Sequence, residues 1–354
     1  MNLLVTGGCG FIGTNLVRRL LRETDHTVVN LDALTYAANP AGLAGVAEAY
    51  PGRYRFVHAS ITDAAAVEPL VREADAVLHL AAESHVDRSV AAGGARVFVE
   101  TNVLGTQVIL DAVRGAEAAD PRGGRRRRLV HVSTDEVYGD LPLDRPELRF
   151  SEATPYAPSS PYSASKAASD LLVRAAHHSF GLDAVVTHCS NNFGPYQFPE
   201  KVIPLFIQRL MDGQKVPLYG DGRNVRDWLH VEDHCAALTA VLERGRPGQT
   251  YAIGGDNERS NRELTGMLLD AFGVGEDRIE PVEDRLGHDR RYAIDASKIR
   301  AELGWEPERS AWPGALEETV RWYRENEAVW RPLVGAGSER GEAGSKRGRE
   351  KERE

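Results

Sequence analysis

The stretch HVSTDEVYGD (131–140) sets two adjacent acids, Asp135 and Glu136, where an apolar strand-like segment ends. A solvated turn is the ordinary interpretation of such a pair, because most exposed Asp-Glu pairs are of this kind. The alternative is chemical, since an acid and a base that face one substrate can give and take protons. Other parts of the sequence have to decide between the two.

A tyrosine and a lysine form a second candidate pair in SPYSASKAASD (160–170). Tyr162 and Lys166 are four residues apart at the start of an expected helix, which puts them on one face. A free tyrosine has a pKa of about 10, and lowering it by about three units needs on the order of 4 kcal/mol. The lysine charge and a second cation in a partly dry site can together supply this. The phenolate would then take a proton from an alcohol, whereas an exposed helical pair would do nothing.

A glycine-rich turn lies near the start of the chain, in LLVTGGCGFIG, which reads as strand, turn and helix. Its Gly-x-Gly-x-x-Gly pattern (8–13) lets a pyrophosphate approach a helix N-terminus. A second strand-like stretch, TVVNLD, ends at Asp32, where a carboxylate would bind the adenine ribose hydroxyls. That carboxylate would repel a 2′-phosphate, and Ala33 and Leu34 offer no arginine for one. We therefore predict NAD as the cofactor rather than NADP.

Alternating strands and helices must hold these groups. Apolar periodicity predicts strands over 2–6, 27–32, 54–58, 75–80, 128–133 and 184–189, and helices over 11–23, 63–73, 95–115 and 161–180. Such alternation is typical of an α/β, Rossmann-type, doubly wound parallel sheet with helices on both faces.

The second half of the chain changes character at about residue 190, where prolines interrupt the pattern. We expect 1–189, with about 228–256, to form the NAD-binding domain, and about 190–227 and 257–330 to form a smaller, discontinuous α/β domain for a nucleotide-sugar. The stretch 216–231 reads as a hairpin that turns at Gly220-Asp221-Gly222. A helix near 231–244 and a strand at 249–254 should return to the first sheet. Residues 335–354 are too polar to bury a core, so we predict a disordered tail.

Composition argues against several other classes of protein. The net charge of −9 over 354 residues speaks against nucleic acid as the main partner, because phosphate binding needs a basic surface. No apolar stretch is long enough for a membrane span, and the strand-like start leaves no place for a signal peptide. Three widely spaced cysteines suggest neither disulfides nor a zinc site, so no metal is expected, and free thiols fit a cytoplasmic location.

Longer strings carry a family resemblance. The glycine turn and the Tyr-x-x-x-Lys pair resemble the extended short-chain dehydrogenase/reductases. LAAESHVDRS (80–89), STDEVYGD (133–140), CSNNFGPYQFPEKVIPLF (189–206) and RDWLHVEDH (226–234) resemble, more closely, the dTDP-glucose 4,6-dehydratases within that family. The resemblance extends from residue 2 to about 330. It implies NAD as cofactor, dTDP-glucose as substrate and a homodimer through 95–115 and 161–180.

The resemblance assigns a purpose to the acid pair. A hexose has no acidic hydrogen at carbon 5, but a ketone at carbon 4 makes that proton removable. By resemblance, Tyr162, with Lys166, takes the proton of the carbon 4 hydroxyl beside Thr134 while hydride leaves carbon 4 for NAD. Glu136 is the base at carbon 5, and Asp135 is the acid for the departing hydroxyl. Hydride then returns to carbon 6, giving dTDP-4-keto-6-deoxyglucose.

The resemblance also implies two sets of binding residues. For NAD these are Gly7, Gly10, Phe11, Ile12, Gly13, Asp32, Leu34, Thr35, Ser60, Ile61, Leu80, Ala81, Ala82, Ser84, Thr101, Tyr162, Lys166 and Asn192. For the nucleotide-sugar they are Ser84, His85, Thr134, Asp135, Glu136, Asn191, Lys201, Val202, Pro217, Tyr219, Arg226, Asn261, Arg285 and His288. One departure concerns the adenine end, where the family usually has an aspartate and this chain has Ser60, which should weaken NAD binding somewhat.

Geometry adds two expectations for the acid pair. Adjacent residues of a regular strand point to opposite faces. Both acids can reach one sugar only if Thr134–Glu136 is already a turn at the carboxyl end of a parallel strand, where open α/β sheets bind ligands. Because two acids at one site rarely ionise together, we expect Asp135 to have the raised pKa.

Three alternatives share the fold. A nucleotide-sugar 4-epimerase also uses NAD and the Tyr/Lys pair, but it needs no acid and base after the threonine, so Asp135-Glu136 argues against it. A 4,6-dehydratase for another nucleotide-hexose differs by few base contacts. A non-catalytic NAD-binding regulator would usually lose the tyrosine or the lysine, and this chain keeps both.

Overall fold

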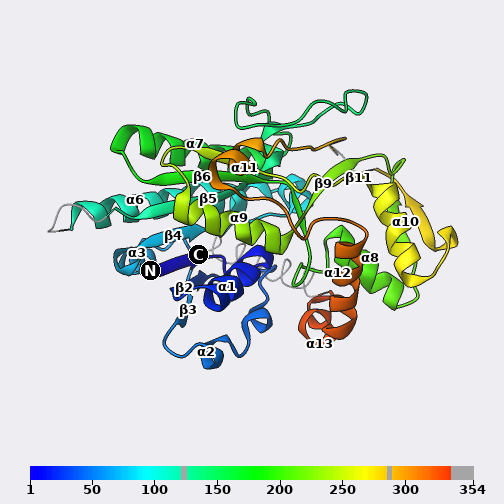
Figure 1. Ribbon diagram of the computed structural model, residues 1–354, viewed down its shortest axis with the longest axis horizontal. Helices are drawn as coiled ribbons and strands as arrows, with labels where there is room; N and C mark the ends of the chain where they lie inside the picture. Colours follow the sequence, from blue (N-terminus) through cyan, green and yellow to red (C-terminus); the bar gives the residue numbers. More distant parts are fainter. Residues whose placement is uncertain (121–125, 285–288, 336–354) are drawn as a thin grey trace, which may run out of the picture.

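The computed structural model describes residues 1–120, 126–284 and 289–335. Its centre is a parallel sheet of seven strands (Figure 1). In sheet order the strands are β10 (Thr250–Ile253), β6 (Ala184–Cys189), β5 (Arg128–Thr134), β4 (Ala76–His79), β1 (Asn2–Thr6), β2 (Thr27–Asp32) and β3 (Tyr54–His58). This order confirms the Rossmann-type sheet, and the strand order reverses between β1 and β4.

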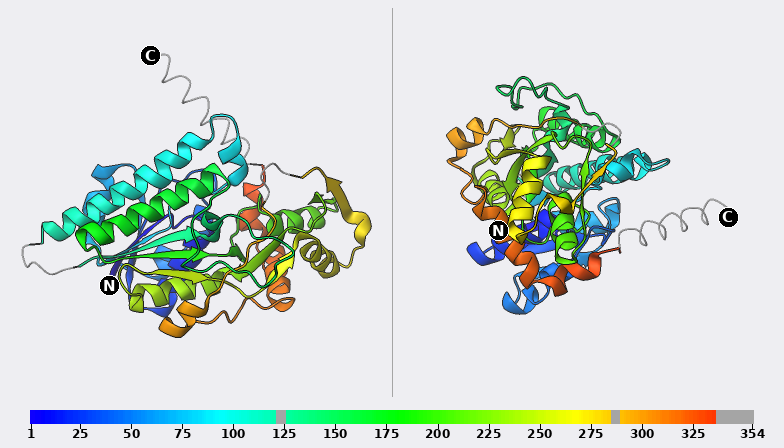
Figure 2. Two further views of the ribbon diagram at one scale, coloured as in Figure 1. Left: turned by 90° about the horizontal axis from the view of Figure 1, so that it is seen from above. Right: turned by 90° about the vertical axis from the view of Figure 1, so that its right-hand side faces the viewer.

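Helices cover both faces of the sheet. One face carries α1 (Phe11–Glu23), α9 (Val231–Arg244) and α11 (Ser297–Leu303), whose apolar residues share a core with β1, β4 and β5. The other carries α3 (Ala64–Glu73), α6 (Gly105–Ala118) and α7 (Pro161–Phe180). Figure 2 shows α6 and α7 side by side along this second face. Two buried faces explain why the strands read as continuous apolar runs rather than as alternating ones.

The predicted helix over 95–115 forms with an interruption. It consists of α5 (Ala95–Phe98), a π-helical stretch η2 (Val99–Leu104) and α6. A π-turn shifts the side chains that follow, and such turns are frequent at functional sites. Thr101 lies in this stretch and lines the main cavity described below.

A second group of elements packs beyond the carboxyl ends of the strands, on the right in Figure 1. It contains a sheet of β11 (Glu258–Ser260), β9 (Val225–His230) and β7 (Asn191–Phe193), and a pair formed by β12 (Ile279–Val282) and β8 (Val216–Tyr219). Its helices are α8 (Val202–Met211), α10 (Asn261–Phe272), α12 (Gly314–Glu325) and α13 (Glu327–Trp330). A separate apolar core joins them.

The hairpin predicted over 216–231 was wrong. A turn does occur there, with Gly220 and Gly222 at φ +55° and +69°, but β8 and β9 do not pair with each other. β8 pairs in parallel with β12, and β9 pairs with β7 and β11. Local turn residues mark where a chain reverses but do not specify the partner of each strand, and here the partners come from distant segments.

The predicted return to the first sheet is confirmed, because α9 covers 231–244 and β10 pairs with β6. The predicted disordered tail lies outside the described residues apart from Gly335. Within the described ranges, every helix is too short or too polar to traverse a bilayer.

Candidate active site

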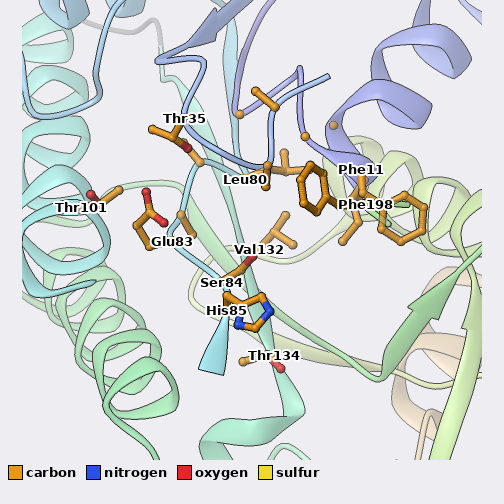
Figure 3. Close-up of a pocket in the computed structure, with 18 of the residues that line it drawn as sticks. Phe11, Thr35, Leu80, Glu83, Ser84, His85, Thr101, Val132, Thr134 and Phe198 are labelled. Atoms are coloured by element: carbon orange, nitrogen blue, oxygen red, sulfur yellow. The ribbon is translucent and has the colours of Figure 1, made fainter. Parts of the chain in front are cut away.

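The main cavity follows the carboxyl edge of the parallel sheet, where the topology predicts ligand binding (Figure 3). Its volume is about 340 Å³. It brings together residues from the ends of β1, β2, β4, β5 and β6, from η2, and from α7. Of the described residues predicted for NAD, all but Leu34 line it.

The glycine turn has the close packing that its glycines predict. Gly7 adopts φ +73°, and a Cβ there would lie 2.7 Å from the main-chain nitrogen of Ala81. A Cβ on Gly13 would lie 2.1 Å from the Gly7 oxygen. Larger residues would push α1 away from β1, so the glycines bring the N-terminus of a 13-residue helix to the cavity. This arrangement fits a dinucleotide pyrophosphate.

Asp32 is fixed at the end of β2 by two main-chain donors. Its Oδ2 accepts from Cys9 N at 2.9 Å and its Oδ1 from Leu34 N at 2.8 Å. Leu34 therefore supports the cavity through its backbone although its side chain does not line it. Burial raises the pKa of Asp32, and these hydrogen bonds oppose the rise. The remaining lone pairs fit ribose hydroxyl donors.

The loop after β4 is held by Asn102 from η2. Asn102 Oδ1 accepts from Glu83 N at 2.8 Å, and its Nδ2 donates to Glu83 O at 3.0 Å and to Ser165 Oγ at 2.8 Å. One buried amide thus connects the loop that carries Ala81, Ala82 and Ser84 to α7. Figure 3 shows Leu80, Ser84 and Thr101 around the same space.

Tyr162 and Lys166 lie in the first turns of α7, which begins with a capping box between Ser160 and Ser163. Both are buried, and both line the cavity. Lys166 Nζ donates to the main-chain oxygen of Val132 at 2.8 Å. The pair is therefore not an exposed helical pair.

The expected lowering of the tyrosine pKa is not produced by the protein's own groups. Burial raises the pKa of Tyr162 well above its usual value, the charge of Glu136 adds to the rise, and a hydrogen bond with Thr134 opposes it. Burial also lowers the pKa of Lys166, against the charge of Asp170. A phenolate at Tyr162 therefore requires additional positive charge, which a nicotinamide cation can provide.

The acid pair lies where the strand turns. β5 ends at Thr134, and Asp135–Tyr138 form the short 3-10 helix η3, which confirms the predicted turn. Thr134 Oγ1 donates to Asp135 Oδ1 at 3.4 Å. The same hydroxyl accepts from the main-chain nitrogen of Glu136 at 3.3 Å. Both acids line the main cavity. The interpretation of the acid pair as part of a solvated turn is therefore wrong.

The pKa values of both acids are raised, but that of Asp135 is raised more than that of Glu136. Burial raises the pKa of Asp135 well above its usual value, and the charge of Glu136 adds to the rise. Burial also raises the pKa of Glu136, but the charges of Lys201 and Arg226 oppose it. The direction for Asp135 agrees with the prediction. Its Oδ2 atom is buried and has no partner among the described residues.

A second cavity of about 240 Å³ adjoins the first, and Glu136 and Asn191 line both. Every described residue predicted for the nucleotide-sugar lines one cavity or the other: Ser84, Thr134 and Asp135 the first, His85, Glu136, Asn191 and Lys201 both, and Val202, Pro217, Tyr219, Arg226 and Asn261 the second. Arg285 and His288 lie outside the described residues.

Arg226 points a cation at this second cavity. Its guanidinium donates to the oxygens of Val225 (2.8 Å) and Asp289 (2.9 Å) and stacks 4.1 Å from the ring centre of Tyr292. A rigid, planar cation of this kind suits a pyrophosphate.

Several cavity residues escaped sequence reasoning. Ser190 follows β6 at the carboxyl edge, so the topological argument that found Thr134 applies to it too. Tyr36 and Phe198 gave no such signal, because they lie in loops. Their rings meet edge to face at 5.7 Å at the cavity, and Arg88 lies 3.6 Å above the Tyr36 ring.

A neighbouring carboxylate, Glu200, joins the same cluster. It contacts His85 Nε2 at 3.0 Å and Arg88 at 3.1 Å. No group of three or more His, Cys, Asp or Glu side chains within 1–120, 126–284 and 289–335 is arranged to hold a metal ion.

Comparison with known proteins gives a consistent result. Residues 4–316 match the family model described as GDP-mannose 4,6 dehydratase. A dTDP-glucose 4,6-dehydratase of Streptomyces antibioticus is 52% identical over 94% of this chain and 95% of its own length, and one of Streptomyces griseus is 53% identical over 95% and 98%. The crystal structure of the Streptomyces venezuelae dTDP-glucose 4,6-dehydratase DesIV, which has NAD bound, is 51% identical and covers 94% of this chain and 100% of its own, with a TM-score of 0.87.

The chain is also similar, at lower sequence identity, to a nucleotide-sugar 4-epimerase, the nearest alternative. The Thermus thermophilus UDP-glucose 4-epimerase in complex with NAD is 30% identical over 92% of this chain and 100% of its own, with a TM-score of 0.79. The epimerase fold is thus shared, while the sequence is much nearer to the dehydratases.

Proposed function

The chain belongs to the dTDP-glucose 4,6-dehydratase family, and from that premise we propose that it converts dTDP-glucose to dTDP-4-keto-6-deoxyglucose with NAD. The reaction oxidises carbon 4, eliminates water across carbons 5 and 6 and returns hydride to carbon 6. The observation that carries the proposal is the meeting of Thr134, Asp135 and Glu136 with Tyr162 and Lys166 in one cavity. An oxidation pair and an acid–base pair at one site suit oxidation followed by elimination.

The described residues fit NAD at the main cavity. Glycine backbone at the N-terminus of α1 offers amides to the pyrophosphate, and Asp32 offers acceptors to the adenine ribose. Ser190 Oγ and Asn191 Oδ1 belong to residues that line this cavity, and both atoms are buried without a partner among the described residues. When bound, NAD supplies the acceptor of the hydride from carbon 4 and its donor to carbon 6.

The protein's own groups manage the protons of the oxidation. Tyr162 takes the proton of the carbon 4 hydroxyl, and Thr134 donates a hydrogen bond to the same oxygen. Lys166, held by Val132 O, supplies a positive charge one helical turn from Tyr162 on α7. These roles follow the contacts and the family pattern.

Elimination falls to the acids. Glu136, whose pKa is less strongly perturbed because Lys201 and Arg226 face it, removes the carbon 5 proton. Asp135, buried and protonated, gives its proton to the leaving hydroxyl of carbon 6. Glu136 later returns a proton to carbon 5. The geometry permits both to act because η3 has left the strand, so the two side chains need not point to opposite faces.

The second cavity is proposed to hold the nucleoside diphosphate, with Arg226 and Lys201 on the phosphates and Asn261 nearby. The domain division follows from this placement. Residues 1–189 with about 228–256 are proposed to hold NAD, and about 190–227 with 257–330 to hold the nucleotide-sugar, except that α11 packs on the first sheet. Thymidine as the base rests on the relatives' names, and another nucleotide-hexose is the alternative within the same chemistry.

A homodimer is proposed through the helices η2, α6 and α7. Five large apolar side chains are unusually exposed on these and the adjoining α5: Val97, Val99, Leu104, Leu171 and Phe180, which we call the apolar face. Apolar surface of this extent on neighbouring helices is typical of an interface. A cytoplasmic location is proposed because all three cysteines are buried free thiols.

The test is incubation of dTDP-glucose with the purified protein in deuterium oxide, followed by mass spectrometry and NMR of the product. We expect loss of one water and one deuterium at carbon 5. Glu136→Gln should abolish both. An unchanged mass with chromatographic conversion to the galactose isomer would establish an epimerase instead, and turnover of UDP-glucose alone would move the proposal to another nucleotide-hexose.

A further inference from the structure

A buried chain of hydrogen bonds lies behind the acid pair. Tyr138, the last residue of η3, has its hydroxyl 2.6 Å from His188 Nδ1. His188 Nε2 lies 3.0 Å from Asp170 Oδ2, and Ser133 Oγ donates to that same oxygen at 2.9 Å. All four side chains are at most 3% exposed.

The direction of each hydrogen bond follows from protonation. Burial would raise the pKa of Asp170, but hydrogen bonds from His131 and His188 hold it below its ordinary value, so this side chain is a carboxylate. A carboxylate only accepts, so His188 Nε2 carries the proton. Nδ1 then accepts from the Tyr138 hydroxyl, which keeps its proton because burial raises the pKa of Tyr138. One tautomer satisfies the whole chain.

This chain of contacts connects the two halves of the catalytic machinery. Asp170 lies on α7, one helical turn beyond Lys166 and two beyond Tyr162. Tyr138 lies two residues after Glu136 in η3. A 3-10 helix of four residues has little stability of its own, so its orientation depends on what holds its end.

We propose that Tyr138, His188 and Asp170 are positioning residues, whose hydrogen-bonded chain fixes the acid–base turn relative to the Tyr162–Lys166 pair. Oxidation at carbon 4 and elimination across carbons 5 and 6 then act on one sugar pose. This inference rests on the proposed function, and it goes beyond it by assigning residues that touch neither substrate nor cofactor.

A matched pair of variants separates positioning from packing. Tyr138→Phe removes the hydroxyl and keeps the ring contact with Phe150, whose centroid is 5.3 Å away. Tyr156→Phe is the control, because its hydroxyl also reaches His188, 3.3 Å from Nε2, but Tyr156 is not part of η3. Misplacement of a reacting group by a fraction of an ångström slows the step that uses it.

The kinetic readout divides the reaction into its steps. In Tyr138→Phe, the rates of elimination and of carbon 5 deuterium exchange should fall by about tenfold or more, while the rate of carbon 4 oxidation stays within about twofold. The reduced cofactor should therefore accumulate, which its absorbance measures. Tyr156→Phe should keep both rates within about twofold. Equal slowing of oxidation and elimination in Tyr138→Phe would overturn the proposal. So would rates in Tyr138→Phe that equal those in Tyr156→Phe.

A second variant covers a folding failure of the first. His188→Gln keeps a donor toward Asp170 but leaves no acceptor at the Nδ1 position that Tyr138 uses, so it should reproduce the elimination defect. Combined with Tyr138→Phe it should add nothing further, because both remove one interaction. Additive losses in the double variant would contradict a shared chain.

A readout independent of turnover tests the tautomer. NMR of protein labelled with ¹⁵N-histidine should show the proton of His188 on Nε2, assigned by the signal that His188→Gln removes among eleven histidines. A proton on Nδ1 would refute the chain even in an active enzyme. If the wild-type protein shows the Nε2–H tautomer but leaves dTDP-glucose unchanged, the proposed function fails and the arrangement stands.

Discussion

The ammonium nitrogen of Lys166 lies 2.8 Å from the main-chain oxygen of Val132, two residues before Thr134 in the same strand. One lysine thereby joins the helix of the oxidation pair to the strand that ends in the acid–base turn. Its charge is also the nearest protein cation available to Tyr162 along α7. The oxidation and the elimination thus depend on one local arrangement.

Replacement of this cation should impair oxidation. Lys166→Met is expected to lower the rate of carbon 4 oxidation by roughly 10²-fold or more, because the Tyr162 phenolate loses stabilisation. The ascending limb of the pH–rate profile should move to higher pH, since a tyrosine without the cation loses its proton later. Single-turnover absorbance of the reduced cofactor measures both effects. Lys166→Arg, which retains charge, should shift the limb less, and an unshifted limb in Lys166→Met would contradict the role.

Asp135→Asn should remove one limb of the pH profile. Burial raises the pKa of Asp135, so in the wild-type protein the acid stays protonated to higher pH and activity falls as pH rises through that pKa. The variant should lose that descending limb and about 10²- to 10⁴-fold in elimination. The profile of kcat for dehydration is the measurement. Asp144→Asn, at an exposed position, is the control and should leave the profile unchanged.

The serine at the adenine end should limit cofactor affinity. Ser60 lines the NAD cavity, and its hydroxyl is 2.8 Å from Thr62 Oγ1. Ser60→Asp should tighten NAD binding by about 3- to 10-fold, because a charged acceptor for the adenine amine is stronger and reaches farther. Calorimetric titration of cofactor-stripped protein measures this. Ser60→Asn supplies the same reach without charge, and equal affinities of these two variants would show that charge is not the cause.

Stability should fall on mild acidification. Burial lowers the pKa of His234 to about 3 and that of His131 to about 4, so the folded protein holds both rings neutral. The unfolded chain takes up protons near pH 6.5, so stability is present above that value and is lost as pH falls toward the folded pKa values. For His234 the loss between pH 6.5 and 5 is about 2 kcal/mol.

The contribution of one ring can be isolated. His234→Asn should reduce the change in unfolding free energy between pH 7 and 5 by the share of His234, measured by chemical denaturation, and His131 should retain its own share. The exposed His178 provides a matched variant, His178→Asn, which should retain the wild-type slope. A wild-type slope in His234→Asn would mean that the ring is protonated in the folded protein.

Charge on the apolar face should separate the protomers. Leu104 and Leu171 are 55% and 53% exposed, on η2 and α7. Light scattering of the wild-type protein should give about twice 38.8 kDa, and the double variant Leu104→Lys/Leu171→Lys should give a monomer. Val334→Lys, at a comparably exposed apolar residue outside that face, should stay dimeric. A wild-type monomer would remove the dimer proposal.

The sequence alone determined the parts of this protein that depend on local chemistry. The glycine turn, the strand that ends at Asp32 and the spacing of Tyr162 and Lys166 are short-range patterns, so their elements formed within one or two residues of the predicted bounds. The exit of Thr134–Glu136 from its strand was predictable too, because side-chain alternation forbids two adjacent acids from facing one ligand inside a strand.

Tertiary structure decided what depends on distant partners. β8 and β9 pair with segments far along the chain rather than with each other, and turn residues contain no information about those partners. The pKa of Tyr162 rises because the side chain is buried, with the charge of Glu136 adding to the rise, and burial exists only once the domain is packed. The contact of Tyr138 with Asp170 through His188 joins residues up to 50 positions apart (Tyr138 and His188) through the third dimension. Electrostatics and register are non-local, and for that reason only the folded chain fixes them.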